Sequence, residues 1–294
     1  MNKVISRLLI FFVGIPLVLA LVFFNKYNHL LLQLVIIAVS ILASLEMYNI
    51  LKVKAELLPK PLVVILSALL PLTAAIIYVL PSFTDINIPS VFITYTLIFD
   101  LLILLATEVF FSQTFEKSNE KLTSSLFVIM YAGFLPTFIQ RMTALKVLGH
   151  ENTDAAIPFI CVFLLMVFLC DSLAWFFGVL LGKNNRGIVK ASPNKSLAGF
   201  AGGFIGSILA GIAGYFIWSE IFSGSIIKII VISILIAFSS IVGDLAESIF
   251  KRSSGVKDSG NIIPGRGGIL DSIDSILMSA PVYYLLINIF YNIA

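Results

Sequence analysis

Residues 222–241 read FSGSIIKIIVISILIAFSSI, and Lys228 is the only charged residue among these 20. Because a helix needs about 20 mostly apolar residues to cross a bilayer, this stretch predicts a membrane-spanning helix. Residues 243–274, GDLAESIFKRSSGVKDSGNIIPGRGGILDSID, then hold five acids, four bases and six glycines, and residues 275–294 carry no charge. A charged, glycine-rich segment between two apolar ones predicts a binding site for a charged ligand at a membrane surface.

The composition of the whole chain is that of an integral membrane protein. Of 294 residues, 59% are hydrophobic and 12% charged, whereas soluble domains carry about 25% charged residues. The net charge of +3 is too weak to indicate nucleic-acid binding, so no nucleic-acid partner is expected. Cys161 and Cys170 lie in one apolar run and are expected to act as small hydrophobic residues.

Nine segments are long and apolar enough to span a membrane, which predicts an all-α polytopic bundle of about nine transmembrane helices. The first follows Lys3 and Arg7, and because no small-residue cleavage site follows it, we expect a retained span. The fifth is the least apolar, since it contains serines, threonines, Gly133 and Pro136. The expected spans are 5–24, 29–51, 61–81, 91–112, 122–140, 156–182, 198–220, 226–250 and 270–292.

The distribution of Lys and Arg predicts a multi-pass protein of the cell (inner) membrane with a cytoplasmic N-terminus. That orientation places 15 of the 19 basic residues on the cytoplasmic side, in agreement with the positive-inside rule. The basic loops 183–197 and 251–269 then face the cytoplasm, where nucleotides are found. Polar motifs concentrate after a connector at 150–154, so we expect an N-terminal transmembrane region at 1–155 (spans one to five) and a catalytic region at 156–294 (spans six to nine).

Three acids lie within or near the ends of apolar spans. For Glu46 and Glu108 an interfacial or helix-paired role is favoured over a catalytic one, although an intramembrane acid stays a functional candidate. Asp171 shares a helical stripe with Ala174 and Gly178, and small residues on that stripe predict close helix packing. A structural role between helices remains open for Asp171.

The loop 183–197 reads KNNRGIVKASPNKSL. Its first bases, Lys183 and Arg186, fit a role as headgroup anchors. Pro193 fixes a turn, after which Ser192, Lys195 and Ser196 offer donors ahead of the next helix. Such a helix start is a natural anion site, so these three are candidate substrate-binding residues.

Around residue 250 acids and bases share helix faces. Asp244, Glu247, Ser248 and Lys251 follow the spacing i, i+3, i+4, i+7, and Asp271 and Asp274 are also three apart. Carboxylates that frame a base-rich loop predict magnesium holding a polyphosphate, with Asp244, Asp271 and Asp274 as the candidate ligands. A structural salt-bridge cluster is the alternative.

These residues also carry a resemblance. The segment 243–274 is similar to the C-terminal signature of the phosphatidate cytidylyltransferases (CDP-diacylglycerol synthases), in outline S-x-x-K-R-x(4)-K-D-x-G-x(3)-P-G-H-G-G-x-x-D-R-x-D. Residues 171–183 resemble the family's D-x-x-A-x-x-x-G-x-x-x-G-K, and 192–199 its S-P-K-K-T-x-E-G. The likeness covers about 156–294. The residues that match the signature are Ser248, Lys251, Arg252, Lys257, Asp258, Gly260, Pro264, Gly265, Gly267, Gly268, Asp271 and Asp274.

Four positions depart from the family pattern. Arg266 replaces a His, Ser272 an Arg, Ala198 a Glu, and Asn194 the first of two paired lysines. Because His and Arg have become Arg and Ser, one guanidinium has moved to the other side of the glycines. The acids of the metal type are unchanged, which favours an active enzyme.

The resemblance implies transfer of a cytidylyl group from CTP to phosphatidic acid, giving CDP-diacylglycerol and pyrophosphate for phospholipid biosynthesis. It implies Mg²⁺ as cofactor, membrane lipids as surroundings, and a homodimer. Glycines would let the substrate approach the backbone. The catalytic candidates are Asp244, Lys251, Arg252, Lys257, Asp258, Arg266 and Asp271, and the substrate-binding candidates are Ser192, Lys195, Ser196, Gly265, Gly267 and Gly268.

Two other functions remain open. A membrane transporter would explain the spans and the intramembrane acids, but not why polar residues gather on two loops instead of near the middle of the membrane. A CTP-dependent lipid kinase has a similar architecture and would release CDP instead of pyrophosphate.

Overall fold

A computed structural model describes residues 14–147, 154–263 and 267–291. The regular elements in these ranges are helices, and pairing of strand type is limited to the isolated bridges Arg186–Ser196 and Ile263–Gly267. Within these ranges, eight helical segments are long and apolar enough to cross a membrane. The predicted all-α membrane fold is therefore confirmed, and the eight segments correspond to predicted spans two to nine. The first predicted span lies partly outside the described residues, and its described part is the helix α2 (Ile15–Phe23).

The described residues form two compact units. Unit 1 is Met1–Arg141 with Phe250–Ser272, and unit 2 is Met142–Ile249 with Ile273–Ala294. The boundary between them crosses two helices, α10 (Ile226–Ser253) and α11 (Leu270–Phe290). The charged segment 250–272 thus belongs to the same unit as the N-terminal helices. The functional division that we expect at 155/156 stays a prediction.

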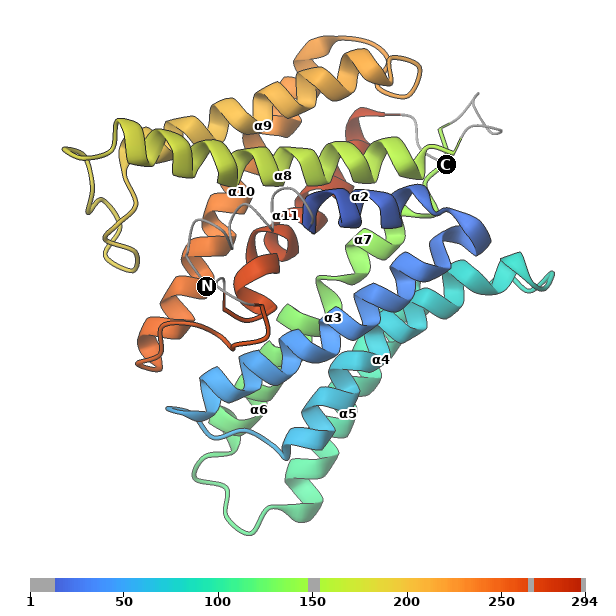
Figure 1. Cartoon of the computed structure of the whole chain (residues 1–294). Helices are drawn as coiled ribbons and strands as arrows, with labels where there is room; N and C mark the ends of the chain where they lie inside the picture. Colours follow the sequence, from blue (N-terminus) through green and yellow to red (C-terminus); the bar gives the residue numbers. More distant parts are fainter. Residues whose placement is uncertain (1–13, 148–153, 264–266, 292–294) are drawn as a thin grey trace. The chain divides into compact units, whose positions relative to one another are not determined.

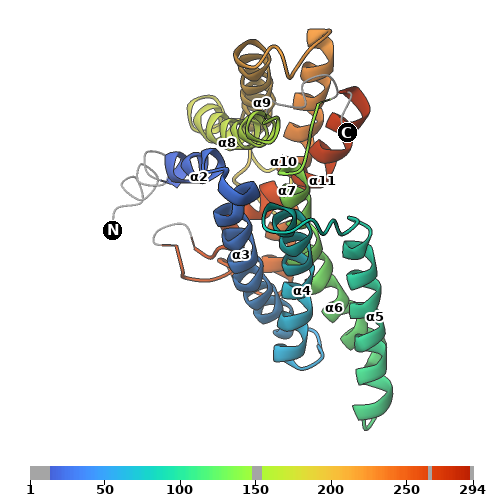
Figure 2. The same cartoon turned by 90° about the vertical axis from the view of Figure 1, so that its right-hand side faces the viewer.

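Unit 1 is built on two long antiparallel helices, which Figure 1 shows side by side. These are α3 (Lys26–Lys52) and α4 (Lys60–Val79), the latter extended by the short helix η2 (Leu80–Ser82). The outer helix α5 (Phe92–Phe111) packs on α4 and on α6 (Ser118–Val128), as Figure 2 shows.

The fifth predicted span is confirmed, but it is not one regular helix. It comprises α6, the π-helix η3 (Ile129–Phe134) and α7 (Thr137–Met142). A β-carbon at Gly133 would collide with the Ser67 carbonyl oxygen of α4, so the glycine permits close packing there. Gly133, one of the residues that made this span less apolar, is therefore a packing residue.

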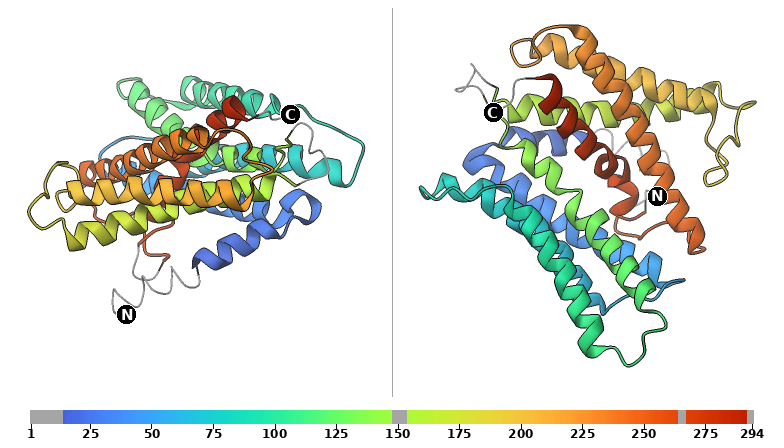
Figure 3. Two further views of the ribbon diagram at one scale, coloured as in Figure 1. Left: turned by 90° about the horizontal axis from the view of Figure 1, so that it is seen from above. Right: turned by 180° about the vertical axis from the view of Figure 1, so that it is seen from behind.

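Unit 2 contains the closely packed pair α8 (Ala156–Leu180) and α9 (Leu197–Ile217). A β-carbon at Gly202 or Gly206 of α9 would meet backbone carbonyls of α8, and one built on Gly178 of α8 would lie 3.7 Å from the Gly199 α-carbon. The predicted small-residue stripe is thus confirmed as a helix contact. Figure 3 shows α10 beside α11, where the Ser239 hydroxyl donates to the Met278 carbonyl (2.8 Å).

Candidate functional site

In unit 1 the carboxylate of Asp271 is held by backbone and side-chain donors. Asp271 lies in the first turn of α11. Its Oδ2 accepts from the Ser259 amide (2.9 Å), the Ser259 hydroxyl (2.9 Å) and the Gly268 amide (2.8 Å). A β-carbon at Gly267, whose φ is +121°, would meet the same carboxylate. The described parts of the loop between α10 and α11 (residues 254–263 and 267–269) are therefore folded around Asp271.

The other oxygen of Asp271 takes part in an ion pair. Its Oδ1 accepts from Lys251 Nζ at 2.5 Å, and the side chains are only 7% and 12% exposed for Asp271 and Lys251. Lys251 lies in the last turn of α10 and Asp271 in the first turn of α11, so the pair joins the two helix ends that flank the loop. A buried ion pair with further hydrogen bonds holds its geometry firmly, because breaking it strands a charge.

Glu46 is a contributor to this region that the sequence did not assign. It comes from α3 and is 5% exposed. Its carboxylate accepts from the Ser259 hydroxyl (2.9 Å) and from the amides of Ile269 (3.0 Å) and Leu270 (2.8 Å). In the sequence, Glu46 stood out as an acid near the end of an apolar span. Such a position indicates that the acid has a partner, but it does not identify the partner.

The remaining candidates of this region differ in exposure. Arg252, Lys257 and Asp258 are exposed, as suits residues that meet a soluble ligand. Gly268 is buried, with Ser259 and Glu46 against its backbone. The predicted site residues Gly265 and Arg266 lie outside the described residues.

In unit 2 a second acid–base pair joins the α8–α9 loop to α10, and the sequence had predicted site residues in both. Lys195 Nζ donates to Asp244 Oδ2, so the α8–α9 loop contacts α10. The side chains are 23% exposed for Lys195 and 40% for Asp244, so this pair is open to solvent. The structure thus brings together two residues that were predicted to hold substrate and metal.

Asp274 is a buried acid of unit 2, at 5% exposure, as is Glu247 at 1%. The negative charges of Asp244, Asp171 and Glu247 all act on its carboxyl group. Asp171 of α8 and Asp244 and Glu247 of α10 therefore lie near enough to Asp274 to act on it electrostatically, and Lys195 is paired with Asp244. Asp171 and Glu247 were outside the metal set predicted from the sequence.

The serines ahead of α9 differ in their surroundings. Ser196 is 2% exposed and is the N-cap of α9, because its hydroxyl accepts from the Gly199 amide at 3.1 Å. Ser192 is half-buried in a turn closed by the Lys195 amide, which donates to the Ser192 carbonyl. Their role in binding substrate stays a prediction.

The carboxylates fit a divalent cation by chemistry, since magnesium prefers carboxylate oxygens, waters and substrate phosphates to an all-protein cage. Buried Asp274 beside three further acids is the observation that favours a cation. Across the ranges that the structure describes, no group of three or more His, Cys, Asp or Glu converges closely enough to hold a metal ion by itself. The set Asp244, Asp271 and Asp274 therefore stays a prediction.

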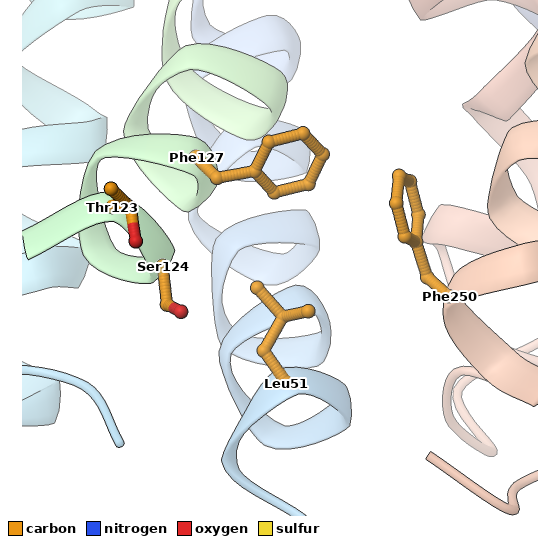
Figure 4. A pocket seen from close by; sticks show the side chains of 5 residues that line it. All are labelled: Leu51, Thr123, Ser124, Phe127 and Phe250. Atoms are coloured by element: carbon orange, nitrogen blue, oxygen red, sulfur yellow. The ribbon is translucent and has the colours of Figure 1, made fainter. Parts of the chain in front are cut away.

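Unit 1 also has an apolar recess. It is lined by Leu51 of α3, by Thr123, Ser124 and Phe127 of α6, and by Phe250 of α10. Figure 4 shows Phe250 facing Phe127 and Leu51 across the opening, and the two phenyl centroids are 5.0 Å apart. Its lining suits an apolar chain more than a nucleotide.

Fold and site together define a polytopic helical membrane protein with acid–base pairs at the ends of apolar spans. The chain matches the Cytidylyltransferase family over residues 5–290, and it belongs to that family. The expected family resemblance is confirmed, and it extends into the N-terminal half of the chain.

Curated relatives match the chain over a shorter stretch. The chain is 38% identical to the phosphatidate cytidylyltransferase of Staphylococcus saprophyticus over 138 residues, which are 47% of this chain and 52% of the relative. It is 43% identical to the phosphatidate cytidylyltransferase of Helicobacter pylori over 124 residues, 42% of this chain and 45% of the relative. The chain thus matches about half the length of these relatives.

Proposed function

We propose that this protein transfers the cytidylyl group of CTP to phosphatidic acid, giving CDP-diacylglycerol and pyrophosphate. The observation that carries the proposal is the buried Lys251–Asp271 pair, because both residues belong to the signature 243–274 and the α10–α11 loop is folded around them. Membership of the Cytidylyltransferase family supports it. So do the relatives named phosphatidate cytidylyltransferase.

The reaction asks for positioning and charge neutralisation more than for proton transfer. A phosphate oxygen of the lipid is already ionised near neutral pH, attacks the α-phosphorus of CTP and forms the new P–O bond. The bond from the α-phosphorus to the bridging oxygen breaks, and pyrophosphate leaves with its electron pair. Fixed cations and dipoles around the phosphates lower such a barrier. A site of acids, bases and glycines without histidine fits this requirement.

The bases of the α10–α11 region would bind the phosphates. Lys251 is held in place by Asp271, while Arg252 and Lys257 are exposed and can reach a soluble nucleotide. Arg266 supplies the guanidinium that other family members carry six residues later, and Asp258 supports the loop. Gly265, Gly267 and Gly268 belong to the same substrate-binding segment. Ser192, Lys195 and Ser196 form the proposed second group of phosphate donors.

Asp244, Asp271 and Asp274 would hold magnesium, which supplies positive charge to the polyphosphate when bound. Lys195 and Lys251 are each paired with one of these acids. Ligand binding would let Lys195, in the more exposed pair, exchange its carboxylate for a phosphate oxygen. The bases would then neutralise substrate charge, and the acids would remain available to the cation.

The lipid substrate would approach from the bilayer. The recess lined by Leu51, Thr123, Ser124, Phe127 and Phe250 is suited to an acyl chain. Phe250 directly precedes Lys251 in the sequence. The 15-to-4 distribution of basic residues favours a cytoplasmic site, where CTP is found. A homodimer is the assembly that the family resemblance implies.

The test uses purified full-length protein in detergent with CTP, phosphatidic acid and Mg²⁺. Formation of CDP-diacylglycerol with one pyrophosphate per lipid supports the proposal. Release of CDP with a phosphorylated lipid would identify a CTP-dependent lipid kinase. Solute flux in proteoliposomes without any CTP turnover would identify a transporter. Either of the last two outcomes overturns cytidylyl transfer.

A further inference from the structure

Glu46 links the N-terminal half of the chain to the α10–α11 loop. Its partners lie 213 to 224 residues further along the chain, at Ser259, Ile269 and Leu270. All four residues belong to unit 1. The proposed reaction assigns no step to Glu46, yet its buried carboxylate is bound to both sides of the loop that carries the candidate phosphate-binding residues.

The contacts with Ile269 and Leu270 complete the start of α11. The first amides of a helix have no partner inside the helix, and they form the positive end of the helix dipole. The Glu46 carboxylate accepts from the Leu270 amide with one oxygen and from the Ile269 amide with the other. A carboxylate from another helix therefore fixes where α11 begins, one residue before Asp271.

Ser259 connects Glu46 to Asp271. The Ser259 hydroxyl lies 2.9 Å from Glu46 Oε2 and 2.9 Å from Asp271 Oδ2. A hydroxyl has one proton, so it donates to one of these carboxylates at a time. Ser259 also donates its amide to Asp271, which in turn accepts from Lys251. A continuous chain of contacts thus runs from Glu46 to the Lys251–Asp271 pair.

Two glycines of the loop leave room for the Glu46 carboxylate. A β-carbon at Gly260 would meet Oε1 and the carboxyl carbon of Glu46, and one at Gly268 would meet Oε2 of Glu46 and the Ser259 hydroxyl. At these positions the absence of a side chain serves an internal carboxylate. A larger residue at Gly260 or Gly268 would therefore displace the Glu46 carboxylate from its present position.

We propose that Glu46 is a positioning residue for the reaction: it holds the α10–α11 loop and the start of α11 so that Asp271 and Lys251 keep their orientation. The inference rests on the proposed function only where it concerns turnover. It extends the functional machinery beyond 156–294 into α3. Outer contacts that orient a ligand-binding carboxylate commonly change affinity or activity by about 10- to 100-fold when they are removed.

The first test is hydrogen exchange, which requires no activity. Glu46→Gln and Glu46→Ala are compared with Glu108→Gln, a matched control because Glu108 is also a buried acid of unit 1 and accepts from the Ser118 hydroxyl instead of the loop. The amides of Ile269 and Leu270 should exchange at least about 10-fold faster in the Glu46 variants, as expected when a hydrogen bond of ordinary strength is lost. Unchanged exchange at these amides would overturn the inference.

The second test is kinetic and separates positioning from stability. Glu46→Gln should lower kcat by about 10-fold and Glu46→Ala by about 100-fold, and both should raise the Mg²⁺ concentration for half-maximal rate. Thermal unfolding of Glu46→Gln should resemble that of Glu108→Gln, which keeps the wild-type Mg²⁺ dependence. If Glu46→Gln and Glu108→Gln change kcat and the Mg²⁺ dependence in the same way, the positioning role of Glu46 is wrong. If the wild type makes no CDP-diacylglycerol, the proposed function fails, while the exchange result still decides the role of Glu46.

A double variant tests the contact itself. Gly260→Ala alone should accelerate exchange in the α10–α11 loop, because the added methyl group collides with the Glu46 carboxylate. In the Glu46→Ala background that collision is absent, so Gly260→Ala should add little. Effects that simply add would show that the two residues are not coupled and would contradict the inference.

Discussion

The two acid–base pairs of this protein use the same residue types in different surroundings. Lys251 and Asp271 in unit 1 are 12% and 7% exposed, and Asp271 also accepts from the amides of Ser259 and Gly268, with the Ser259 hydroxyl 2.9 Å away. Lys195 and Asp244 in unit 2 are 23% and 40% exposed. Solvent weakens the second pair, whereas the first is held by its neighbours. The comparison indicates a preorganised pair and an exchangeable one.

This difference assigns separate tasks to two lysines that look alike in the sequence. A lysine that is already fixed can present its charge to phosphate without losing much conformational freedom, so it contributes mainly to the rate. A lysine in a solvent-exposed pair can leave its carboxylate at low cost and bind an arriving ligand. We therefore expect Lys251 to affect kcat and Lys195 to affect KM for CTP.

The largest effects are expected from the acids. Asp271→Asn and Asp244→Asn should each reduce Mg²⁺-dependent CTP turnover by about 1000-fold, because a neutral amide oxygen lacks the charge with which a carboxylate binds Mg²⁺. Only Asp271→Asn should also destabilise the fold, by about 3 kcal/mol, since it leaves Lys251 buried without its anion. For Asp244→Asn the loss of stability should be below about 1 kcal/mol.

Pyrophosphate release and thermal unfolding in detergent measure the two quantities. Turnover close to that of the wild type in either variant would contradict the magnesium assignment. Equal stability losses in the two variants would contradict the contrast between the pairs.

The lysines should give the next largest effects. Lys251→Met should lower kcat by about 100-fold with a small change in KM, whereas Lys195→Met should raise KM for CTP by about 10-fold, in line with a charge lost at a fixed or an exchangeable position. Steady-state kinetics over a range of CTP concentrations measures both. The same kcat and KM pattern in the two variants would show that exposure does not separate their roles.

A smaller effect is expected where the chain departs from the family pattern. Arg266→Ala should reduce kcat/KM by about 10-fold and Ser272→Ala by less than about 3-fold, because only the first removes a guanidinium that can bind phosphate. The measurement is the initial rate at low CTP concentration. Two small and equal effects would refute a relocated guanidinium.

The smallest effect concerns the apolar recess. Ser124→Leu should fill part of the space between Leu51, Phe127 and Phe250. We expect about a 4-fold loss of rate with long-chain phosphatidic acid and little change with a short-chain analogue, since the lost burial of one methylene group is worth about 0.8 kcal/mol. Rates measured with both lipids decide the point. Equal losses with the two lipids would exclude the recess as an acyl-chain site.

Much of the fold follows from the sequence because apolar length alone predicts membrane helices. The spans predicted at 226–250 and 270–292 correspond to Ile226–Ser253 and Leu270–Phe290. The π-helix at Ile129–Phe134 was not predicted, because it depends on the approach of α4 to Gly133. Hydropathy reports solvation by lipid, and it contains no information on such a contact.

The residues of the candidate site could be predicted from the sequence, but the contacts between them could not. Asp244, Lys195, Lys251 and Asp271 were singled out by local spacing. Their pairing across 49 and 20 residues depends on how the chain folds. Glu46 escaped assignment because its partners are more than 200 residues away in the sequence, while its neighbours in α3 are mostly apolar.

The most direct test of the central claim follows two phosphorus atoms of CTP. Purified protein is incubated with phosphatidic acid, Mg²⁺ and CTP labelled at either the α- or the γ-phosphate. Cytidylyl transfer predicts that the α-label enters the lipid fraction and that the γ-label is released as pyrophosphate. Entry of the γ-label into the lipid, with the α-label released as CDP, would contradict it.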